Sequence, residues 1–397
     1  MAAPPPPTPV HLIRAHSHPL SALFVSEDNE RIYSGDASGR VVVTSTRSLR
    51  ALVAWNPHSD GLLGLQEHRN QIITHARDNK IHVWALPPPP APLQLGASAA
   101  VPDLPVPDLL YSLDVNALNY CRFSLLSSHH DAFLLAVPNL VESSLADVWS
   151  LPSKERLHAA IGKPTPGAPA PKDGRGGIIM SMSLLPPDVP SSPSSSQSSA
   201  LRLLAAYESG AVKLWTYDAS KNEGRSTSIE GIAWQCTWEA KAHVESTMAM
   251  AVSRDLSFAL SISADHLIGK YDLSALEKDP TLKPEPHRTK HPGNGSLAIH
   301  DAGRVCAVGG WDGRIRLYST KTFKPLGTLT YHKDSVQALA FAHAQLRETD
   351  GGPLPQEDVD DDEDMTSSEK RARARWLVSG GKDGRVAIWE LVDFSRR

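Results

Sequence analysis

The sequence of 397 residues predicts an all-β fold, a single seven-bladed β-propeller, and three observations support that prediction. The first is a hairpin-like stretch from Gly309 to Thr320, and the second is its recurrence from Ser379 to Trp389. The third is the spacing of the copies, whose shortest steps of 40 and 47 residues are close to the roughly 40–45 residues of a four-stranded blade.

Each copy combines a tight turn with an alternating strand. In the stretch from Gly309 to Thr320 the turn is Asp312-Gly313, where glycine adopts a positive φ without penalty and aspartate can bond its own backbone. From Arg314 to Leu317 polar and apolar residues alternate, which is the period of a half-buried strand. The unit is therefore a strand, a turn and a second strand that ends in an aromatic residue.

Seven copies of this unit follow one another along the chain. Their second strands end at Thr44, Trp84, Trp149, Trp215, Tyr271, Tyr318 and Trp389. Two more strands are expected ahead of each hairpin, and before the last one they are residues 325–329 and 336–341. The first strand, Val10 to Arg14, precedes the first complete blade. We therefore expect it to pair as the outermost strand of the last blade and to remove a sheet edge.

The longer steps between copies contain segments rich in proline, glycine, serine or acidic residues, which cannot bury enough apolar surface to fold. We expect these segments to be disordered loops outside the core. The predicted organisation is a Pro-rich disordered tail at 1–9 and one propeller domain at 10–397, with insertions at about 87–108, 160–177, 186–200, 219–231, 274–292 and 343–375.

The composition argues against several classes of protein. The formal net charge of −4 argues against a broad nucleic-acid-binding surface. Three widely separated cysteines, an N-terminus unlike a signal peptide and the lack of a long apolar run predict a soluble intracellular protein. The chain has no His-Glu-x-x-His, Cys-x-x-Cys or Walker-A pattern. We therefore expect no catalytic, cofactor-binding or metal site, no membrane contact and no small-molecule substrate.

Short signatures in the copies resemble those of the WD40-repeat family, and the resemblance covers nearly the whole chain. Three dipeptides stand where the family has Gly-His: Ala15-His16, Ala242-His243 and Tyr331-His332. Four stand where it has Trp-Asp: Val83-Trp84, Val148-Trp149, Leu214-Trp215 and Ile388-Trp389. No copy retains the aspartate after the tryptophan.

In that family a His, a Ser or Thr, a turn Asp and the strand-ending Trp form a buried hydrogen-bond network, and a buried aspartate needs such partners. In the last blade the resemblance implies His332, Ser379, Asp383 and Trp389. In the fifth it implies His243, Ser263, Asp265 and Tyr271, with tyrosine in place of tryptophan. The first blade has Ser38 and Thr44 at the Asp and Trp positions, so whether the first and third blades keep a network stays open.

Two charged segments follow each other inside the last blade, an acidic one at 357–364 and a basic one at 370–375. The simplest interpretation is a solvated loop, from which residues 351–372 could be removed without loss of the folded state. The alternative is a segment that docks a partner, with the basic half as a nuclear-import signal.

The hairpin turns also offer a candidate partner surface. Trp311 and Arg314 belong to one turn, and Lys382 and Arg385 belong to the next. The aspartates of the same turns are expected to serve the turns themselves.

Longer stretches resemble the fungal ASTRA-associated WD-repeat family, which is related to the Gβ-subunit-like proteins of animals. They are residues 11–16, 309–318, 325–332 and 380–391, together with the acidic insertion in the last blade. The resemblance implies a non-catalytic scaffold subunit of the nuclear ASTRA complex. That assembly is tied to chromatin remodelling and to maturation of phosphatidylinositol-3-kinase-related kinases with their co-chaperones. The expected partners are its protein subunits, and the expected location is the nucleus, with the cytoplasm as a second location.

Two alternative functions stay open at this point. One is a substrate-receptor propeller of a ubiquitin ligase, whose docking residues are too few and too degenerate to decide from sequence. The other is a Gβ-like signalling subunit, which is disfavoured because a Gβ would carry an N-terminal coiled-coil helix and here the first strand begins by Val10. The sequence names neither the partner nor the face that it contacts.

Overall fold

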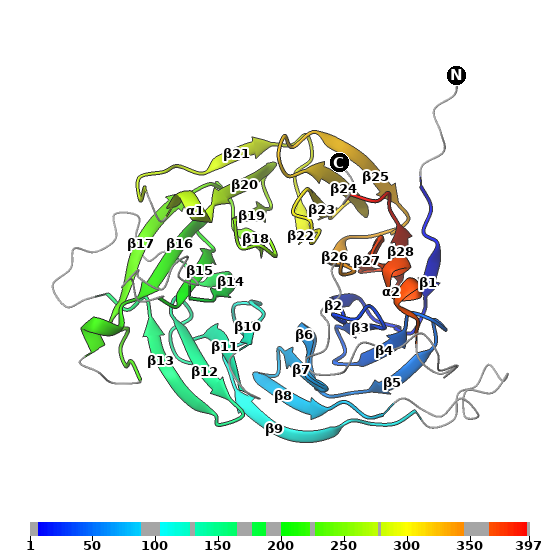
Figure 1. Cartoon of the computed structure of the whole chain (residues 1–397), viewed down its shortest axis with the longest axis horizontal. Helices are drawn as coiled ribbons and strands as arrows, with labels where there is room; N and C mark the ends of the chain where they lie inside the picture. The colour runs from blue at the N-terminus through cyan, green and yellow to red at the C-terminus, as the bar shows by residue number, and fades with distance from the viewer. Residues whose placement is uncertain are drawn as a thin grey trace. The chain divides into compact units, whose positions relative to one another are not determined.

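A computed structural model describes residues 7–88, 104–127, 132–164, 177–187, 200–222, 227–276, 279–344 and 365–394. Within these residues the chain forms 28 strands in seven four-stranded sheets, which Figure 1 labels along the chain. We call the sheets blades 1 to 7 in chain order. The chain is a seven-bladed β-propeller, as the sequence predicts.

The first compact unit comprises residues 1–74, 82–111 and 298–397, and it holds blades 1 and 7 and most of blades 2 and 6. Blade 1 consists of β2 (Leu20–Val25), β3 (Arg31–Asp36), β4 (Val41–Ser45) and β5 (Ala51–Trp55). Blade 2 consists of β6 (Leu62–His68), β7 (Gln71–Ala76), β8 (Lys80–Ala85) and β9 (Asp108–Asp114). Blade 6 consists of β22 (Asn294–Ile299), β23 (Val305–Gly310), β24 (Arg314–Ser319) and β25 (Pro325–Thr330). Blade 7 consists of β26 (Val336–Phe341), β27 (Trp376–Gly381), β28 (Val386–Glu390) and β1 (His11–Ile13).

The second compact unit comprises residues 75–81 and 112–297, and it holds blades 3, 4 and 5. Blade 3 consists of β10 (Ser124–Ser127), β11 (Phe133–Pro138), β12 (Ala146–Leu151) and β13 (Glu155–Ile161). Blade 4 consists of β14 (Ile179–Leu185), β15 (Arg202–Tyr207), β16 (Ala211–Tyr217) and β17 (Trp234–Lys241). Blade 5 consists of β18 (Thr247–Val252), β19 (Phe258–Ser263), β20 (Leu267–Asp272) and β21 (Glu285–Arg288).

The N-terminal strand completes the last blade, as expected from its position ahead of blade 1. Strand β1 pairs with β28 in antiparallel register, with His11 opposite Ile388 and Ile13 opposite Val386. The Ile13 side chain is buried in one apolar cluster with residues of β2, β27 and β28. The pairing covers the backbone edge of β28, which would otherwise be open to another chain.

Four elements lie inside segments that the sequence predicts to be loops. They are η2 (Ala219–Asn222), α1 (Leu273–Leu276), β21 (Glu285–Arg288) and α2 (Ser367–Arg373). Strand β21 has the sequence Glu-Pro-His-Arg and lacks a buried alternating face, so its pairing with β20 is mainly a matter of backbone bonds. Apolar periodicity cannot detect such a strand. None of the helices among the described residues is long and apolar enough to span a membrane.

Candidate interaction surfaces

The four residues expected to form a network in the last blade lie together in blade 7. Nδ1 of His332 is 3.1 Å from a carboxylate oxygen of Asp383, and Nε2 is 2.8 Å from Oγ of Ser379. Nε1 of Trp389 donates to the same Oγ at 2.9 Å. Because a carboxylate only accepts, Nδ1 carries the proton, and Nε2 accepts from the serine hydroxyl. Burial lowers the pKa of His332, and Asp383 opposes this effect only in part, so the ring is neutral at pH 7.

This network holds two backbone segments next to each other. Asp383 accepts from the backbone N of Arg385 at 3.1 Å and from that of Lys333 at 3.3 Å. The turn after β27 is therefore fixed to the loop before β26. A buried, fully paired group of this kind orients the exposed side chains beside it.

In blade 5 the hydroxyl of the network belongs to Ser261, and the expectation of Ser263 was wrong. Nε2 of His243 lies 2.7 Å from Oγ of Ser261, which also lies 2.7 Å from the hydroxyl of Tyr271. Nδ1 of His243 is 3.3 Å from both carboxylate oxygens of Asp265. In the part of the chain that the structure describes, Oγ of Ser263 does no more than accept from the backbone N of Asp265, at the long distance of 3.4 Å.

The spacing in the last blade could have identified the correct serine. Ser379 lies four positions before Asp383, and Ser261 is the residue four positions before Asp265. Ser263 lies two positions further along β19, on the same face of the strand but one pleat away from the histidine.

Blade 1 keeps a three-residue version of the network with its aspartate moved. Nδ1 of His16 is 2.7 Å from Asp36, and Nε2 is 2.8 Å from Oγ of Ser34. Ser38, which stands at the turn position, donates its hydroxyl to Asp36 at 2.6 Å. Thr44 is buried at the aromatic position and its hydroxyl has no hydrogen-bond partner within the described part of the chain. The sequence suggested Ser38 as the departure but did not show that Asp36 replaces it.

Blade 3 has a different arrangement around Asp147. This carboxylate accepts from Nδ2 of Asn139 at 2.9 Å and from the backbone N of Ala160 at 2.8 Å. The guanidinium of Arg156 lies 3.5 Å from its other oxygen and 5.7 Å from the ring centre of Trp149. The tryptophan thus contacts a cation instead of donating to a serine.

The candidate partner surface lies on two neighbouring turns of the first unit. Trp311, which is 49% exposed, and Arg314 lie at the β23–β24 turn, while Lys382 and Arg385 lie at the β27–β28 turn. Gly313 has φ +75°, and a Cβ there would be 2.4 Å from the carbonyl oxygen of His332. This close approach seats the first turn on the loop that the blade 7 network holds. Both turns therefore contact the same loop between β25 and β26.

Asp312 acts within its own turn, as expected. It accepts from the backbone N of Arg314 at 3.2 Å and forms an ion pair with Arg316 at 2.5 Å. Burial alone would raise the pKa of Asp312, but the hydrogen bonds from Arg316 and Arg314 lower it overall. Arg314 itself stays exposed beside Trp311.

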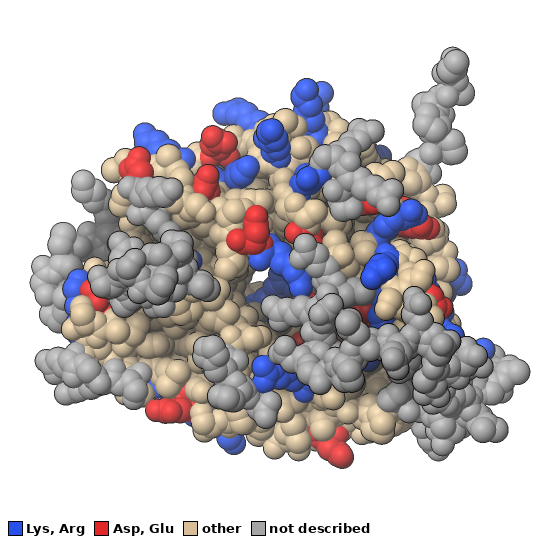
Figure 2. All heavy atoms as spheres, in the orientation of Figure 1, with Lys and Arg blue, Asp and Glu red and all other residues tan. Residues whose placement is uncertain are grey.

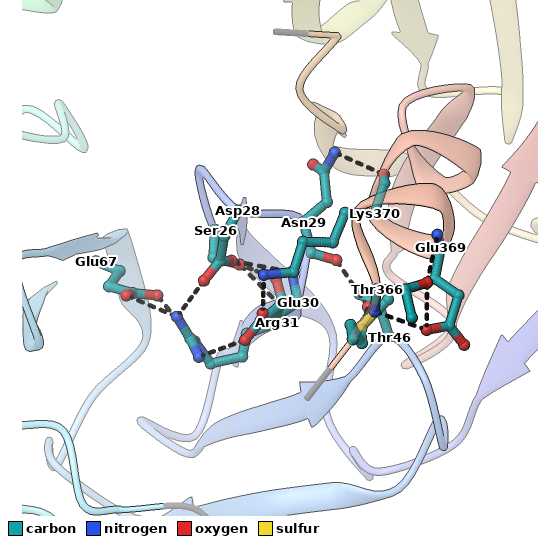
Figure 3. A network of polar contacts seen from close by, with 11 residues as sticks. Ser26, Asp28, Asn29, Glu30, Arg31, Thr46, Glu67, Thr366, Glu369 and Lys370 are labelled. Atoms are coloured by element: carbon teal, nitrogen blue, oxygen red, sulfur yellow. Dashed lines mark hydrogen bonds and ion pairs between the residues drawn. The ribbon is translucent and has the colours of Figure 1, made fainter. Parts of the chain in front are cut away.

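A second site, which the sequence did not predict, lies where the long insertion of blade 7 meets blade 1 (Figure 3). Asn29 is fully buried and has φ 62°. Its Nδ2 donates to the carbonyl oxygens of His343 at 2.8 Å and Lys370 at 3.3 Å, and its Oδ1 accepts from the backbone N of His343 at 2.8 Å. One side chain thus ties both described ends of the insertion to blade 1. We call these contacts the Asn29 clamp.

Charged residues surround the clamp (Figure 3). Arg31 pairs with Asp28 at 2.8 Å and with Glu67 at 3.1 Å, and Glu30 pairs with Lys370 at 2.5 Å. Burial would raise the pKa of Asp28, but Arg31 and the hydroxyl of Ser26 lower it overall. Of these pairs, Glu30–Lys370 crosses from blade 1 to the insertion, whereas the pairs of Arg31 hold the neighbouring part of blade 1 to itself and to blade 2.

Helix α2 is part of this contact. Thr366 caps it and forms a capping box with Glu369, a pattern that the sequence contains as Thr-x-x-Glu and that could have predicted the helix. Met365 is buried, and its Sδ lies 3.3 Å from Oγ1 of Thr46 in blade 1. Removing residues 351–372 would delete these contacts, so we expect the deletion to lower stability, while survival of the folded state stays a prediction.

The basic segment 370–375 is largely engaged in the fold. Lys370 pairs with Glu30, Arg375 pairs with Glu390, and the guanidinium of Arg373 lies 4.9 Å from the ring centre of Trp376. Use of this segment as an extended import signal would require these contacts to break. The acidic segment 357–364 lies outside the described residues.

No group of three or more His, Cys, Asp and Glu residues in the described ranges could hold a metal ion. Burial raises the pKa of Cys121 and Cys306 to about 12, which disfavours the thiolate form. Figure 2 shows Lys and Arg interspersed with Asp and Glu on the face in view, without one field of positive charge.

Comparisons with known proteins show what the chain is similar to. The family model for the WD domain, G-beta repeat, matches residues 286–319. A Verticillium alfalfae protein named ASTRA-associated protein 1 is 31% identical over 408 residues, covering 97% of this chain and 93% of that protein. A protein of the same name from Penicillium rubens is 29% identical over 448 residues, covering 97% and 98%.

Two further comparisons concern a mouse protein and a designed protein. The mouse guanine nucleotide-binding protein subunit beta-like protein 1 is 24% identical, covering 98% of this chain and 97% of that protein. The crystal structure of the computationally designed Ika8 protein has a TM-score of 0.54 and 16% identity, covering 97% of this chain and all of that one. The likeness to Ika8 concerns the fold alone.

Proposed function

The chain belongs to the ASTRA-associated protein 1 family, and from that premise we propose that it is a non-catalytic scaffold subunit of an ASTRA-like assembly. The observation that carries the proposal is the 31% identity to a protein of that name across 97% of this chain. A propeller offers rigid turn-and-loop surfaces to partners, which suits a scaffold. The finer roles that we propose are chromatin remodelling and maturation of phosphatidylinositol-3-kinase-related kinases, exercised in the nucleus.

We propose that one contact with a partner subunit uses the surface formed by Trp311, Arg314, Lys382 and Arg385. An exposed tryptophan among basic side chains has the composition of an interface hot spot. The hydrogen-bond network of blade 7 holds the turn that carries Lys382 and Arg385, so little conformational entropy would be lost on binding.

Purification of the tagged chain from its own cells, followed by mass spectrometry, tests the proposed function. Wild-type chain should recover ASTRA subunits at near-stoichiometric levels. Trp311→Ala combined with Arg385→Glu should lower that recovery at least about tenfold, as expected for a hot spot. Leu326→Ala is the matched control, because Leu326 is 50% exposed on blade 6 and should have no effect.

The similarity to the mouse protein supports a second candidate function, that of a Gβ-like signalling subunit. The same purification separates the candidates. Recovery of Gγ-like chains would favour the signalling subunit, and recovery of cullin adaptors would favour a ubiquitin-ligase receptor. Either result without ASTRA subunits would overturn the proposed function.

A further inference from the structure

Four large apolar side chains project into solvent from two loops of the second unit. Leu118 is 69% exposed and Tyr120 58% exposed in the loop between β9 and β10. Leu140 is 55% exposed and Val141 91% exposed in the turn between β11 and β12. We call these four side chains the apolar platform. Single exposed apolar residues are ordinary, whereas a contiguous group usually marks an interaction site.

Buried asparagines hold the two loops against each other. Nδ2 of Asn116 donates to the carbonyl oxygen of Asn139 at 3.0 Å and to Oγ of Ser143 at 2.9 Å. Nδ2 of Asn119, which is fully buried, donates to the carbonyl oxygens of Ser143 and Ile179, both at 2.7 Å. These bonds come from residues on either side of Leu118, so they fix the loop at the point where the platform projects.

The second loop is shaped in the same way. Oδ1 of Asn139 accepts from the backbone N of Val141 at 3.0 Å and of Glu142 at 2.9 Å, while its Nδ2 donates to the buried Asp147. The most exposed side chain of the platform, Val141, therefore stands on a turn whose backbone is already bonded. The platform is ordered before any partner arrives, which lowers the entropic cost of binding.

Tyr120 has a strained backbone, and its ring packs against the cationic side chain of Arg77. It has φ 55°, a left-handed conformation that costs a non-glycine residue free energy and often marks a functional position. Its ring lies 4.8 Å from the guanidinium of Arg77, in the β7–β8 turn. Arg77 is exposed and has no carboxylate partner within the described ranges.

A bound protein segment fits this chemistry better than other ligands. Four apolar side chains with Arg77 and Arg122 nearby give too little positive charge for a nucleic-acid backbone. Tyrosine and arginine are the residues that dominate protein interfaces, and apolar side chains surround them here. Arg77, which has no carboxylate partner among the described residues, can pair with a carboxylate that the partner places next to the apolar contact.

We propose that the apolar platform binds an apolar segment of a partner protein, and that a carboxylate side chain of this segment pairs with Arg77. The inference rests on the proposed function only in taking that partner to be a subunit of the assembly. The platform belongs to the second unit and the Trp311 surface belongs to the first.

The first test maps what touches the platform in the native assembly. The tagged chain with Val141→p-benzoylphenylalanine is crosslinked in its own cells, and the attached peptide is sequenced. Val392→p-benzoylphenylalanine is the matched control, because Val392 is also an exposed valine, at 71%, and belongs to the first unit. We expect position 141, and not position 392, to crosslink one peptide that contains apolar residues and an aspartate or glutamate.

The second test uses that peptide, synthesised with a fluorophore, as the probe for the full-length purified chain. Arg77→Glu should weaken its binding at least about tenfold, and replacing the peptide carboxylate by lysine should restore binding to the Arg77→Glu chain. Val141→Asp should weaken binding by a similar factor, whereas Val392→Asp should not. Circular dichroism of each variant shows whether the chain is folded.

Three outcomes overturn the inference: equal crosslinking at both positions, a crosslinked peptide without a carboxylate, or peptide binding unaffected by Arg77→Glu. A specific crosslink to a peptide of the expected chemistry in a protein outside the ASTRA assembly would support the platform and contradict the proposed function. If instead Val141→Asp leaves the recovery of ASTRA subunits unchanged and position 141 gives no crosslink, the proposed function is supported and the binding role of the platform is contradicted.

Discussion

At the scale of single residues, hydrogen-bond partners decide which side chains the fold cannot lose. An example is given by two buried serines, which lie on one face of β19 in blade 5. Ser261 bonds both His243 and Tyr271, whereas Ser263 offers only a long contact to a backbone N. Residue type and burial are the same, and only the position on the strand differs.

Ser261→Ala should therefore destabilise the protein by about 1–3 kcal/mol, because it leaves two buried polar groups without a partner. Ser263→Ala should cost less than about 1 kcal/mol. Urea unfolding followed by tryptophan fluorescence measures both. Equal losses in the two variants would contradict the assignment of Ser261 to the network.

His158 gives a prediction about pH. Its ring is buried 4.5 Å from the ring of Tyr217 and 5.3 Å from that of Trp234, and burial lowers its pKa to about 4. The unfolded chain, with a pKa near 6.5, then takes up the proton first. The stabilisation is complete above pH 6.5 and is lost as the pH falls from 6.5 toward 4.

His158→Gln, which cannot titrate, should flatten this dependence. Free energies of unfolding measured between pH 7 and pH 5 should fall less steeply in the variant than in the wild-type chain. Parallel curves for the two proteins would show that His158 is not the group responsible.

At the scale of elements, α2 and the Asn29 clamp show an insertion that is partly built into the propeller. A seven-residue helix is too short to be stable alone, so its order depends on contacts with blade 1. Met365, Lys370 and the Asn29 clamp provide them. Release of α2 would also free the basic side chains that the import-signal interpretation requires.

Asn29→Gly should loosen α2 while keeping the backbone conformation, because glycine accepts a positive φ. We expect a loss of about 1–3 kcal/mol and faster amide hydrogen exchange in residues 367–373. Asn29→Ala should cost about 1 kcal/mol more, owing to the left-handed backbone. Unchanged exchange in α2 for both variants would mean that the clamp does not hold the helix.

Deletion of residues 351–372 should likewise lower the urea midpoint, since it removes Lys370 from Glu30 and leaves the Asn29 amide with one partner fewer. The deleted chain should still fold, because none of the strands of blade 7 lies within 351–372. A midpoint equal to that of the full chain would restore the simple loop interpretation.

At the scale of the whole molecule, the pairing of β1 with β28 joins the start of the chain to its last blade. Ile13 faces the apolar cluster shared by blades 1 and 7, while the adjacent Leu12 is 36% exposed on the other face. The contribution of β1 to stability should therefore depend on one face only.

Ile13→Ala should cost about 2–4 kcal/mol, in the range of buried large-to-small changes, and Leu12→Ala should cost less than about 1 kcal/mol. Thermal and urea unfolding of the two variants give the comparison. Similar losses would mean that β1 stabilises through its backbone bonds and not through packing of Ile13.

The sequence by itself determined the features that depend on neighbours along the chain. The Asp312-Gly313 turn, the alternation after it and the recurrence of the aromatic strand ends predicted the hairpins and the fold class, because turn chemistry and pleat period are local properties. The last-blade residues His332, Ser379, Asp383 and Trp389 could be named because they match the hydrogen-bond motif of the family that the sequence resembles. The same match gave Ser263 in place of Ser261, two positions away on the strand.

Only the tertiary structure decided the features that depend on distant residues. Asn29 meets His343 across 314 positions of sequence, and no local pattern marks that encounter. Strand β21 is held by backbone bonds that its side chains do not reveal. The apolar platform exists because buried asparagines bring two loops together. Such contacts follow from how the blades pack and not from periodicity, so the sequence could predict the blades but not the surfaces between and upon them.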